Sequence, residues 1–345
     1  MENIISNDKI TEYLSDFLTS PFTLIDVGCS GGIHQAWEAF GEKIIGIGFD
    51  PVVAEINRLN KRRYPQFQYV EGFVTGPKKS EAPSTFWNRL AVSETNKIIQ
   101  EKKKLKPLDA LKRNLWPDLK LSDKNIELEE YFSSRNIIPN FIKIDVDGDD
   151  FNILQSLKRL LDRPNVLGIG IEVNYCGTDA ATQNTFHNVD RFLRKHGFEL
   201  YDLTVRKYSL AALPAPYSIT IPAQSNRGRP LQGDALYFKD LILLDTELAT
   251  NINDILIMAC LFSVFDQKDS CAELLLTYRD KLPSEIDLDF VLDQLVNDMN
   301  TEAFEGLNYK QLIKKFQEND DIFYPNYIKV AKERAFKKVS KFLKK

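Results

Sequence analysis

Residues 22–50 read FTLIDVGCSGGIHQAWEAFGEKIIGIGFD, and this stretch decides the expected fold. Two short apolar runs, TLIDVG and KIIGIGFD, enclose a small-residue turn and a helix-like segment over residues 33–41. Short apolar runs of this kind, bounded by turn residues, are typical of buried strands. A strand, a helix and a second strand in this order predict parallel strands joined by a crossover helix, which is the α/β layout.

The turn between the first strand and the helix, GCSGG at residues 28–32, has the composition of a ligand-binding loop. Glycines let the backbone approach a ligand closely, and the N-terminus of the following helix offers unpaired N–H groups. Asp50, at the end of the second strand, is placed to accept protons from both hydroxyls of a ribose. The dinucleotide pattern G-x-G-x-x-G is not met, because Ser30 and Ile33 stand where its second and third glycines would be.

Asp26, shortly before Gly28, adds a negative charge beside this turn. The charge would repel a pyrophosphate, and it suits a ligand with a cationic part. S-adenosylmethionine has a sulfonium and an ammonium group, no phosphate, and a ribose for Asp50. We therefore predict S-adenosylmethionine as the cofactor, held by Asp26, Gly28, Ser30, Gly32 and Asp50.

The alternation of strands and helices continues along the chain, so residues 1–240 are predicted as one α/β domain. NFIKIDVDGDD, NVLGIGIEVN and FELYDLTV read as further strands, and FNILQSLKRLL is amphipathic at helical spacing. Residues 76–139 interrupt the pattern as a region rich in insertions, with loops and short helices. Beyond residue 240 only helical patterns occur, which predicts a small helical C-terminal domain over residues 241–345.

The segment NFIKIDVDGDDFNILQSL resembles the strand-four motif of the FkbM type of class I S-adenosylmethionine-dependent methyltransferases. That motif is a Lys-x-Asp-x-acid-Gly run before an apolar helix, and Lys143, Asp145, Asp147 and Gly148 stand at its positions. IGIEVN, which contains Glu172, is similar to the acidic end of the family's strand five. The resemblance covers roughly residues 20–240 and implies a Rossmann-like sheet of seven strands with helices on both faces.

The resemblance also implies methyl transfer to a hydroxyl group, often on a sugar or a natural product. It implies an adenine-side loop at FVTG, with Phe73 and Val74 as cofactor contacts, although AVSE at residues 91–94 is similar to the same loop. Asp145 joins the expected cofactor contacts. Two departures from the family are Ser30, where Asn is frequent, and Asp147, where Glu is frequent.

Carboxylates are the main candidates for the chemistry, because an alcohol needs a base or a metal ion to remove its proton. Asp145, Asp147 and Glu172 follow two strands that are expected to be neighbours. Close carboxylates raise one another's pKa, which would make one of them a base, or they could bind a divalent cation. His34 opens the first helix and His187 lies near the start of a later one; each is a second catalytic candidate, with a structural role as the alternative.

Four residues in and after the loop beyond residue 203 are candidates for binding the substrate: Arg206, Tyr208, Arg227 and Arg229. Arginine pairs well with phosphate or carboxylate, so the acceptor could carry a nucleotide, a lipid phosphate or a uronic acid. Solvation of the surface is the alternative explanation.

The composition of the 345-residue chain limits its partners and location. A net charge of -4 and a pI of about 5.6 argue against binding nucleic acid through a general basic face. Four cysteines without metal-site spacing, after a polar N-terminus, predict a reduced, cytoplasmic protein.

The longest apolar run, ILIMACLFSVF, is about half of the roughly 20 residues that span a bilayer. The basic C-terminal segment YIKVAKERAFKKVSKFLKK could make peripheral contact with the inner face of the membrane, or dock as an ordinary helix.

These features together predict an S-adenosylmethionine-dependent O-methyltransferase acting on a hydroxyl of a sugar, a glycan or a glycan precursor. One alternative is a catalytically silent cofactor-binding scaffold that recruits a glycosyltransferase. Another is an oxidoreductase that uses a nicotinamide cofactor.

Overall fold

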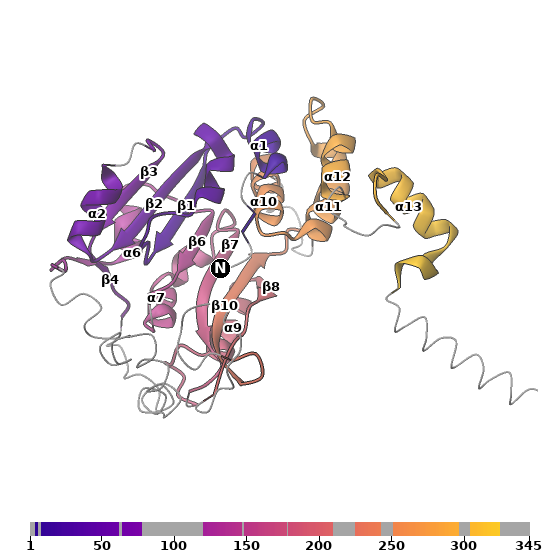
Figure 1. Cartoon of the computed structure of the whole chain (residues 1–345). Coiled ribbons are helices and arrows are strands. Elements are labelled where there is room, and N and C mark those ends of the chain that lie inside the picture. Colours follow the sequence, from indigo (N-terminus) through magenta and orange to yellow (C-terminus); the bar gives the residue numbers. More distant parts are fainter. Residues whose placement is uncertain are drawn as a thin grey trace, which may run out of the picture. The chain divides into compact units, whose positions relative to one another are not determined.

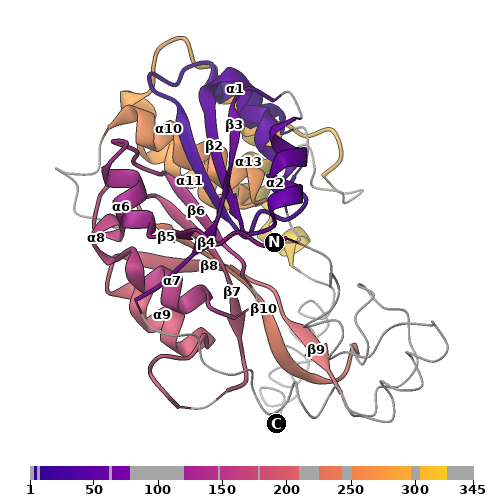
Figure 2. The same cartoon turned by 90° about the vertical axis from the view of Figure 1, so that its left-hand side faces the viewer.

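The computed structural model describes residues 4–5, 8–61, 64–77, 120–146, 148–177, 179–209, 225–242, 251–296 and 304–324. The chain forms two compact units, Met1–Lys281 and Leu282–Lys345. The first unit contains the sheet (Figure 1, Figure 2). The second contains α12 (Leu288–Val296), α13 (Tyr309–Glu318) and the short helix η3 (Asp320–Phe323).

The first unit is built on one sheet with the strand order β3-β2-β1-β6-β7-β10-β8, and β9 pairs with β10. Its strands are β1 (Phe22–Val27), β2 (Ile44–Asp50), β3 (Phe67–Glu71), β6 (Phe141–Ile144), β7 (Gly168–Asn174), β8 (Phe198–Leu203), β9 (Arg206–Tyr208) and β10 (Arg229–Lys239). The pairs from β3 to β7 are parallel, whereas β10 is antiparallel to β7, β8 and β9. This confirms the predicted Rossmann-like α/β fold, with seven strands along the main path of the sheet.

The strand order reverses at β1, and this reversal decides where a ligand can bind. The chain runs outward from β1 to β2 and β3, then returns to place β6 on the other side of β1. In open α/β sheets, ligands bind outside the carboxyl ends of the strands at such a reversal. The expected site therefore lies beyond the carboxyl ends of β1 and β6.

Helices cover both faces of the sheet. In the first unit they are α1 (Lys9–Ser15), η1 (Gln35–Lys43), α2 (Val53–Asn60), α6 (Leu128–Ser133), α7 (Asp150–Ser156), α8 (Lys158–Leu161), α9 (Phe186–Arg194), α10 (Ile252–Val264), α11 (Lys268–Thr277) and η2 (Arg279–Lys281). Alternate residues of a strand face opposite sides. Ile142 therefore joins the core formed with α6, α7, α8 and α9, which lie together in Figure 2. Phe141 points the other way, with its ring centroid 5.5 Å from that of Trp37 and 5.2 Å from that of Phe265.

Several elements differ in detail from the sequence prediction. The helix expected at residues 33–41 is the 3-10 helix η1, which Gly41 interrupts with a non-helical φ of 55° and ψ of -127°. The helix expected after β6 divides at Leu157 into α7 and α8. The strand β3 ends before Gly72, after which the chain forms β4 (Phe73–Val74), and β4 pairs in parallel with β5 (Asn125–Ile126).

The edge strand β3 has part of its outer side closed by a side chain of α2. Asn60 Nδ2 donates to Tyr69 O at 2.8 Å, and Tyr69 N donates to Asn60 Oδ1 at 3.1 Å. One side-chain amide thus completes both hydrogen bonds that the backbone of Tyr69 would offer to a further strand.

The first compact unit extends beyond the division predicted at residues 240 and 241. It includes α10, almost all of which is buried. Thr11 Oγ1 of α1 donates to Cys260 O at 3.2 Å, and Ser263 Oγ donates to Asp8 Oδ1 at 2.9 Å. Most of the expected insertion and the C-terminal basic segment lie outside the described residues.

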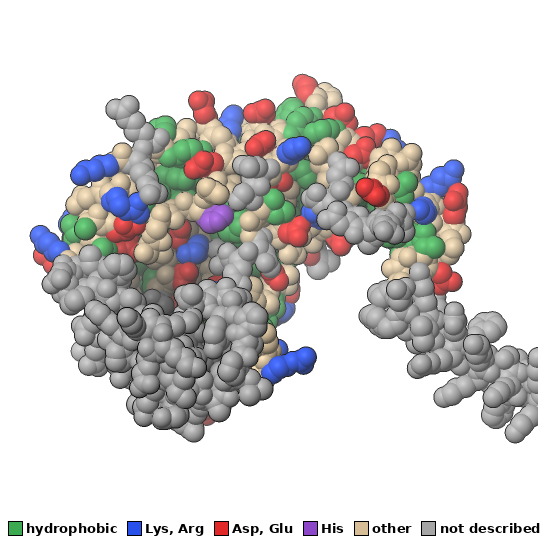
Figure 3. All heavy atoms as spheres, viewed as in Figure 1, with side chains coloured by type: hydrophobic (Ala, Val, Ile, Leu, Met, Phe, Trp, Pro, Cys, Tyr) green, Lys and Arg blue, Asp and Glu red, His purple; other side chains and the backbone are tan. Residues whose placement is uncertain are grey.

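Within the described ranges, none of the helices combines the length and the apolar character that crossing a bilayer requires. On the face drawn in Figure 3, basic and acidic side chains are interspersed over the described residues.

The burial of α10 predicts which fragment of the chain folds. A fragment of residues 1–281 should unfold cooperatively, whereas one of residues 1–240 should not, because it leaves the apolar surfaces of α1 and the sheet exposed to water. Thermal unfolding of both fragments, followed by near-ultraviolet circular dichroism, measures the difference. A cooperative transition of the shorter fragment at the same midpoint would contradict this role of α10.

Candidate active site

The glycine turn after β1 is fixed against both neighbouring strands. Gly28 N donates to Phe49 O of β2 at 2.9 Å, and Asp145 N donates to Val27 O of β1 at 3.0 Å. A Cβ atom on Gly28 would lie 1.9 Å from Asp145 O, and its φ is +84°. Only glycine fits here, because the turn touches the backbone that leaves β6.

The rest of the turn faces α2. Gly31 N donates to Glu55 Oε1 of α2 at 3.1 Å. A Cβ atom on Gly32 would lie 2.9 Å from Leu59 Cδ2, whereas one on Gly31 would meet nothing within 4 Å. Ser30 is exposed. Residues 30 and 31 are therefore exposed, although the Gly31 N–H is bonded to Glu55, while Gly32 is packed against the helix.

Lys143 joins the carboxylates of Asp26 and Asp145. Its Nζ lies 3.2 Å from Asp26 Oδ1 and 3.3 Å from Asp145 Oδ2. Burial raises the pKa of Asp26, and the Lys143 ammonium opposes this effect. Burial acts to lower the pKa of Lys143, but the two carboxylates hold it above its usual range. The charge of Asp26, which the sequence assigned to a cationic ligand, is thus paired inside the protein.

Asp50 ends β2 at the same edge of the sheet. Only 5% of the residue is exposed, and its Oδ1 accepts a hydrogen bond from Val52 N at 2.8 Å. Burial raises the pKa of Asp50, against the effect of this hydrogen bond. Burial also raises the pKa of the Cys29 thiol, with the nearby Asp26 and Asp50 adding to the effect. Cys29 is therefore an unreactive part of the packing below the turn.

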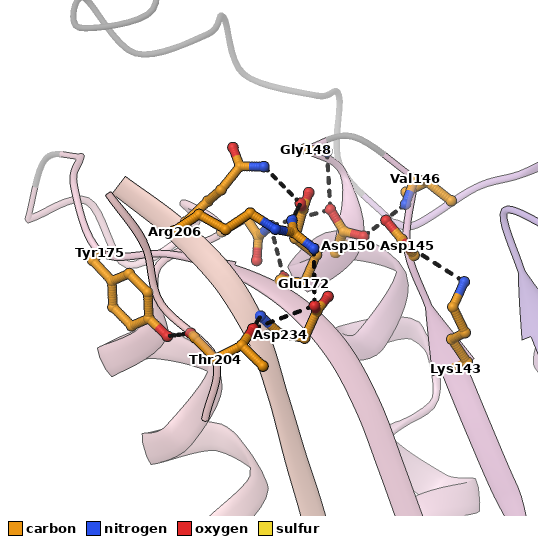
Figure 4. Close-up of polar contacts among 12 residues, drawn as sticks. Lys143, Asp145, Val146, Gly148, Asp150, Glu172, Tyr175, Thr204, Arg206 and Asp234 are labelled. Atoms are coloured by element: carbon orange, nitrogen blue, oxygen red, sulfur yellow. Dashed lines mark hydrogen bonds and ion pairs between the residues drawn. The ribbon is translucent and has the colours of Figure 1, made fainter. Parts of the chain in front are cut away.

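Asp150 organises the turn that follows β6 (Figure 4). Its side chain is fully buried, Oδ1 accepts a hydrogen bond from Val146 N at 2.8 Å, and Oδ2 accepts one from Gly148 N at 2.9 Å. Burial raises the pKa of Asp150 to about 7, although these backbone donors act to lower it. Asp147, a predicted catalytic residue, lies outside the described residues.

Glu172 of β7 and Arg206 of β9 form an ion pair, and both of these strands pair with β10 (Figure 4). The Arg206 guanidinium lies 3.2 Å from Glu172 Oε1 and 3.0 Å from Asp234 Oδ2. Gln232 Nε2 donates to Glu172 Oε1 at 3.0 Å. The structure thus brings together a predicted catalytic residue and a predicted substrate residue, and each engages the other.

The two histidine candidates make local contacts. His34 is the N-cap of η1, where its Nδ1 accepts a hydrogen bond from Ala36 N at 3.2 Å. His187 is exposed on α9, with Nε2 3.4 Å from Thr185 Oγ1. These local contacts agree with a structural role, which was the alternative to a catalytic role for both histidines.

The other predicted contacts are spread around this edge. Tyr208 on β9 is fully buried, whereas Arg227 and Arg229 are exposed. Phe73 is partly exposed and Val74 is half-buried, both on β4. In the part of the chain that the structure describes, which lacks Asp147, no group of three or more His, Cys, Asp or Glu residues could hold a metal ion.

Several residues of this site were not among the site residues expected from the sequence: Lys143, Asp150, Asn184, Gln232 and Asp234. The strand register would have indicated two of them, because Lys143 lies directly opposite Asp26 and Asp234 lies directly opposite Glu172 on the paired strands. This indication can be used only once the strand order is known.

The glycine turn after β1, the buried carboxylate at the end of β2 and the strand order are the arrangement expected of an S-adenosylmethionine-dependent methyltransferase. The space beside Gly31 is free and Asp50 ends β2 at the position expected for the ribose, so these residues fit this cofactor. Residues 90–200 match the model of the methyltransferase FkbM domain, which is the family that the sequence resembles. The matched range contains Asp145, Asp150 and Glu172.

Several solved structures of methyltransferases resemble the chain, although the likeness is slight. A precorrin-6y C5,15-methyltransferase from Geobacter metallireducens is 13% identical, with 69% of this chain and 92% of that chain covered at a TM-score of 0.31. A magnesium protoporphyrin IX methyltransferase from Synechocystis with bound S-adenosylmethionine is 10% identical, with 68% and 77% covered at 0.31. An S-adenosylmethionine-dependent methyltransferase from Aquifex aeolicus is 12% identical, with 66% and 89% covered at 0.27. No curated protein matches the chain.

The close approach at Gly28 predicts a difference between two glycines of one turn. Gly28→Ala should lower the free energy of unfolding by more than Gly31→Ala, because both have positive φ but only the first meets backbone atoms. Left-handed strain alone costs about 1–2 kcal/mol, and the displaced strand end adds to it at Gly28. Urea unfolding of both variants measures the difference, and equal losses would contradict the close contact.

The raised pKa of Asp150 predicts a pH dependence of stability. A folded pKa of about 7, above the ordinary 3.8, means that the folded protein keeps a proton that the unfolded chain releases. The resulting stabilisation is complete below about pH 4 and is lost as the pH rises through about 7. Relative to Asp150→Asn, the free energy of unfolding should fall on the order of 2 kcal/mol between about pH 5 and pH 7. Chemical unfolding at several pH values measures this change, and parallel curves for the two proteins would exclude it.

Proposed function

We propose that this protein is an O-methyltransferase that acts on a hydroxyl of a sugar, a glycan or a glycan precursor. The observation that carries the proposal is the position of Asp145. It follows β6 directly and lies against the glycine turn, and 38% of its side chain is exposed. An accessible carboxylate beside the cofactor turn is a suitable base for a hydroxyl acceptor.

Asp145 would accept the proton of the acceptor hydroxyl as the new carbon–oxygen bond forms. S-adenosylmethionine, when bound, would supply the methyl group, and breaking of its methyl–sulfur bond would leave S-adenosylhomocysteine. Lys143 holds Asp145 Oδ2 at 3.3 Å, and no described residue bonds to Oδ1. Lys143 also neutralises the neighbouring Asp26, which keeps the negative charges at this edge from opposing one another.

Glu172 is better suited to fixing the acceptor side of the site than to accepting a proton. Its Oε1 already accepts hydrogen bonds from Arg206 and Gln232. With both partners in place, Glu172 holds Arg206 against Asp234 and ties β7, β9 and β10 together. This supports Asp145 rather than Glu172 as the base.

Two features support the acceptor class. The chain after β6 reads Asp-Val-Asp-Gly, and not the Asn/Asp-Pro-Pro-aromatic signature common in enzymes that methylate amino groups. Arg227 and Arg229 are exposed next to or at the start of β10, where they could pair with a phosphate or a carboxylate. The acceptor we propose is therefore a sugar linked to a nucleotide or a lipid phosphate, met in the cytoplasm or at the inner face of the membrane.

Asp145→Asn should lower kcat for methyl transfer to a hydroxyl acceptor by about 100-fold or more, because the amide cannot accept the proton. Binding of S-adenosylmethionine, measured by calorimetry, should persist. The assay follows methyl label from S-adenosylmethionine into nucleotide sugars and lipid-linked glycans, with mass spectrometry to locate the methyl group.

Glu172→Gln is the matched control, since it also replaces a carboxylate by an amide at this edge. It should retain most of kcat and lower the midpoint of thermal unfolding, because Arg206 loses an ionic partner. Transfer to nitrogen, full activity of Asp145→Asn, or no transfer to any hydroxyl acceptor would overturn the proposal.

A further inference from the structure

The turn after β6 is tied to the end of β7 through Asn184. Asn184 Nδ2 donates to Asp150 Oδ2 at 3.1 Å and to Glu172 O at 3.2 Å. Both side chains are buried. The Asp150 carboxylate therefore accepts hydrogen bonds from the backbone of Val146 and Gly148 and from one amide, and that amide also bonds to the backbone of β7.

A carboxylate at the position of Asp150 is energetically unfavourable. The described residues place no Lys or Arg within ion-pair distance of its fully buried carboxylate. Burying a carboxylate without a cation destabilises a protein unless hydrogen bonds compensate. The turn has two backbone N–H groups that need acceptors, and the two carboxylate oxygens of Asp150 accept one each. This geometric requirement would explain why an acid stands here.

Capping of α7 does not explain Asp150, because the adjacent Asp149 stands at the N-cap position. Asp149 is partly exposed and accepts hydrogen bonds from Asn152 Nδ2, at 3.2 Å to each oxygen. Its carboxylate lies at the start of the helix, where it complements the helix dipole. The two neighbouring acids thus have separate partners: Asp149 bonds within the helix, and Asp150 bonds to the turn before it.

The backbone on both sides of Asp145 is anchored as a result. Its own N–H donates to Val27 O of β1, and the next N–H, of Val146, donates to Asp150. The Gly148 N–H, bound to the other oxygen of the same carboxylate, fixes the far end of the turn. The direction in which the Asp145 side chain leaves the strand therefore depends on Asp150.

We propose that Asp150 and Asn184 form a positioning pair that sets the place of Asp145 for proton transfer. Neither residue needs to touch the acceptor, and both act through the backbone N–H groups of Val146 and Gly148. The kinetic part of this proposal rests on the proposed function, in which Asp145 is the base. Its structural part does not.

The test compares Asp150→Asn with Asp149→Asn, a matched change at the adjacent residue. Asp150→Asn replaces one acceptor oxygen by an NH2 group, so one backbone N–H of the turn loses its partner. We expect faster hydrogen exchange at Val146 or Gly148 and a kcat lower by about 10- to 100-fold. The KM for the acceptor and the affinity for S-adenosylmethionine should change little. Asp149→Asn should leave both the exchange and kcat close to the wild-type values.

Asn184→Ala is the second variant, and it keeps the carboxylate bonded to both backbone groups. We expect a smaller decrease in kcat and a smaller increase in exchange than in Asp150→Asn. If Asp150→Asn does not fold, this variant decides alone, and wild-type exchange at both Val146 and Gly148 then overturns the proposal.

The outcomes separate the positioning pair from the proposed function. Unchanged exchange in Asp150→Asn overturns the pair whatever the reaction is. Faster exchange with unchanged kcat would show that Asp150 orders the turn without positioning the base, and this result also overturns the proposal. If no hydroxyl acceptor is methylated, the proposed function fails, and faster exchange in Asp150→Asn but not in Asp149→Asn still supports the structural part.

Discussion

The close contact between the backbones of Gly28 and Asp145 is the constraint on which the site depends. It brings the turn after β1 against the chain that leaves β6, at the point where the strand order reverses. The absence of a side chain at Gly28 permits this contact, and hydrogen bonds from both segments to neighbouring strands maintain it. The cofactor turn and the candidate base are therefore held together by main-chain geometry, which side-chain motion cannot change.

Charges at this edge of the sheet are arranged in separate groups. Lys143 pairs with Asp26 and Asp145, and Arg206 pairs with Glu172 and Asp234. Among the described residues, Asp150 is bonded by N–H donors alone. In each group, a carboxylate that would be unfavourable alone is matched by donors from an adjacent strand or turn. This separation gives each acid a different task, although the sequence shows them only as a series of carboxylates at strand ends.

The fold could be predicted from the sequence because its strands are short apolar runs that end at turn residues. β1, β2, β6 and β7 were all visible in this way, and the glycine turn and Asp50 followed from them. The partners of Asp26 and Glu172 could not be predicted, because Lys143 and Arg206 are distant in sequence and meet them only through strand pairing. For the same reason the sequence did not show that α10 belongs with the sheet, since its contacts with α1 join opposite ends of the first unit.

The Asn60 side chain also affects the tendency of the protein to aggregate. A sheet whose edge strand offers free backbone groups can recruit a strand from another molecule, and such pairing leads to aggregation. At Tyr69 in the middle of β3, both backbone groups are already bonded to the Asn60 amide. An incoming strand would have to displace this amide before it could pair there, so α2 protects the edge of the sheet against intermolecular growth.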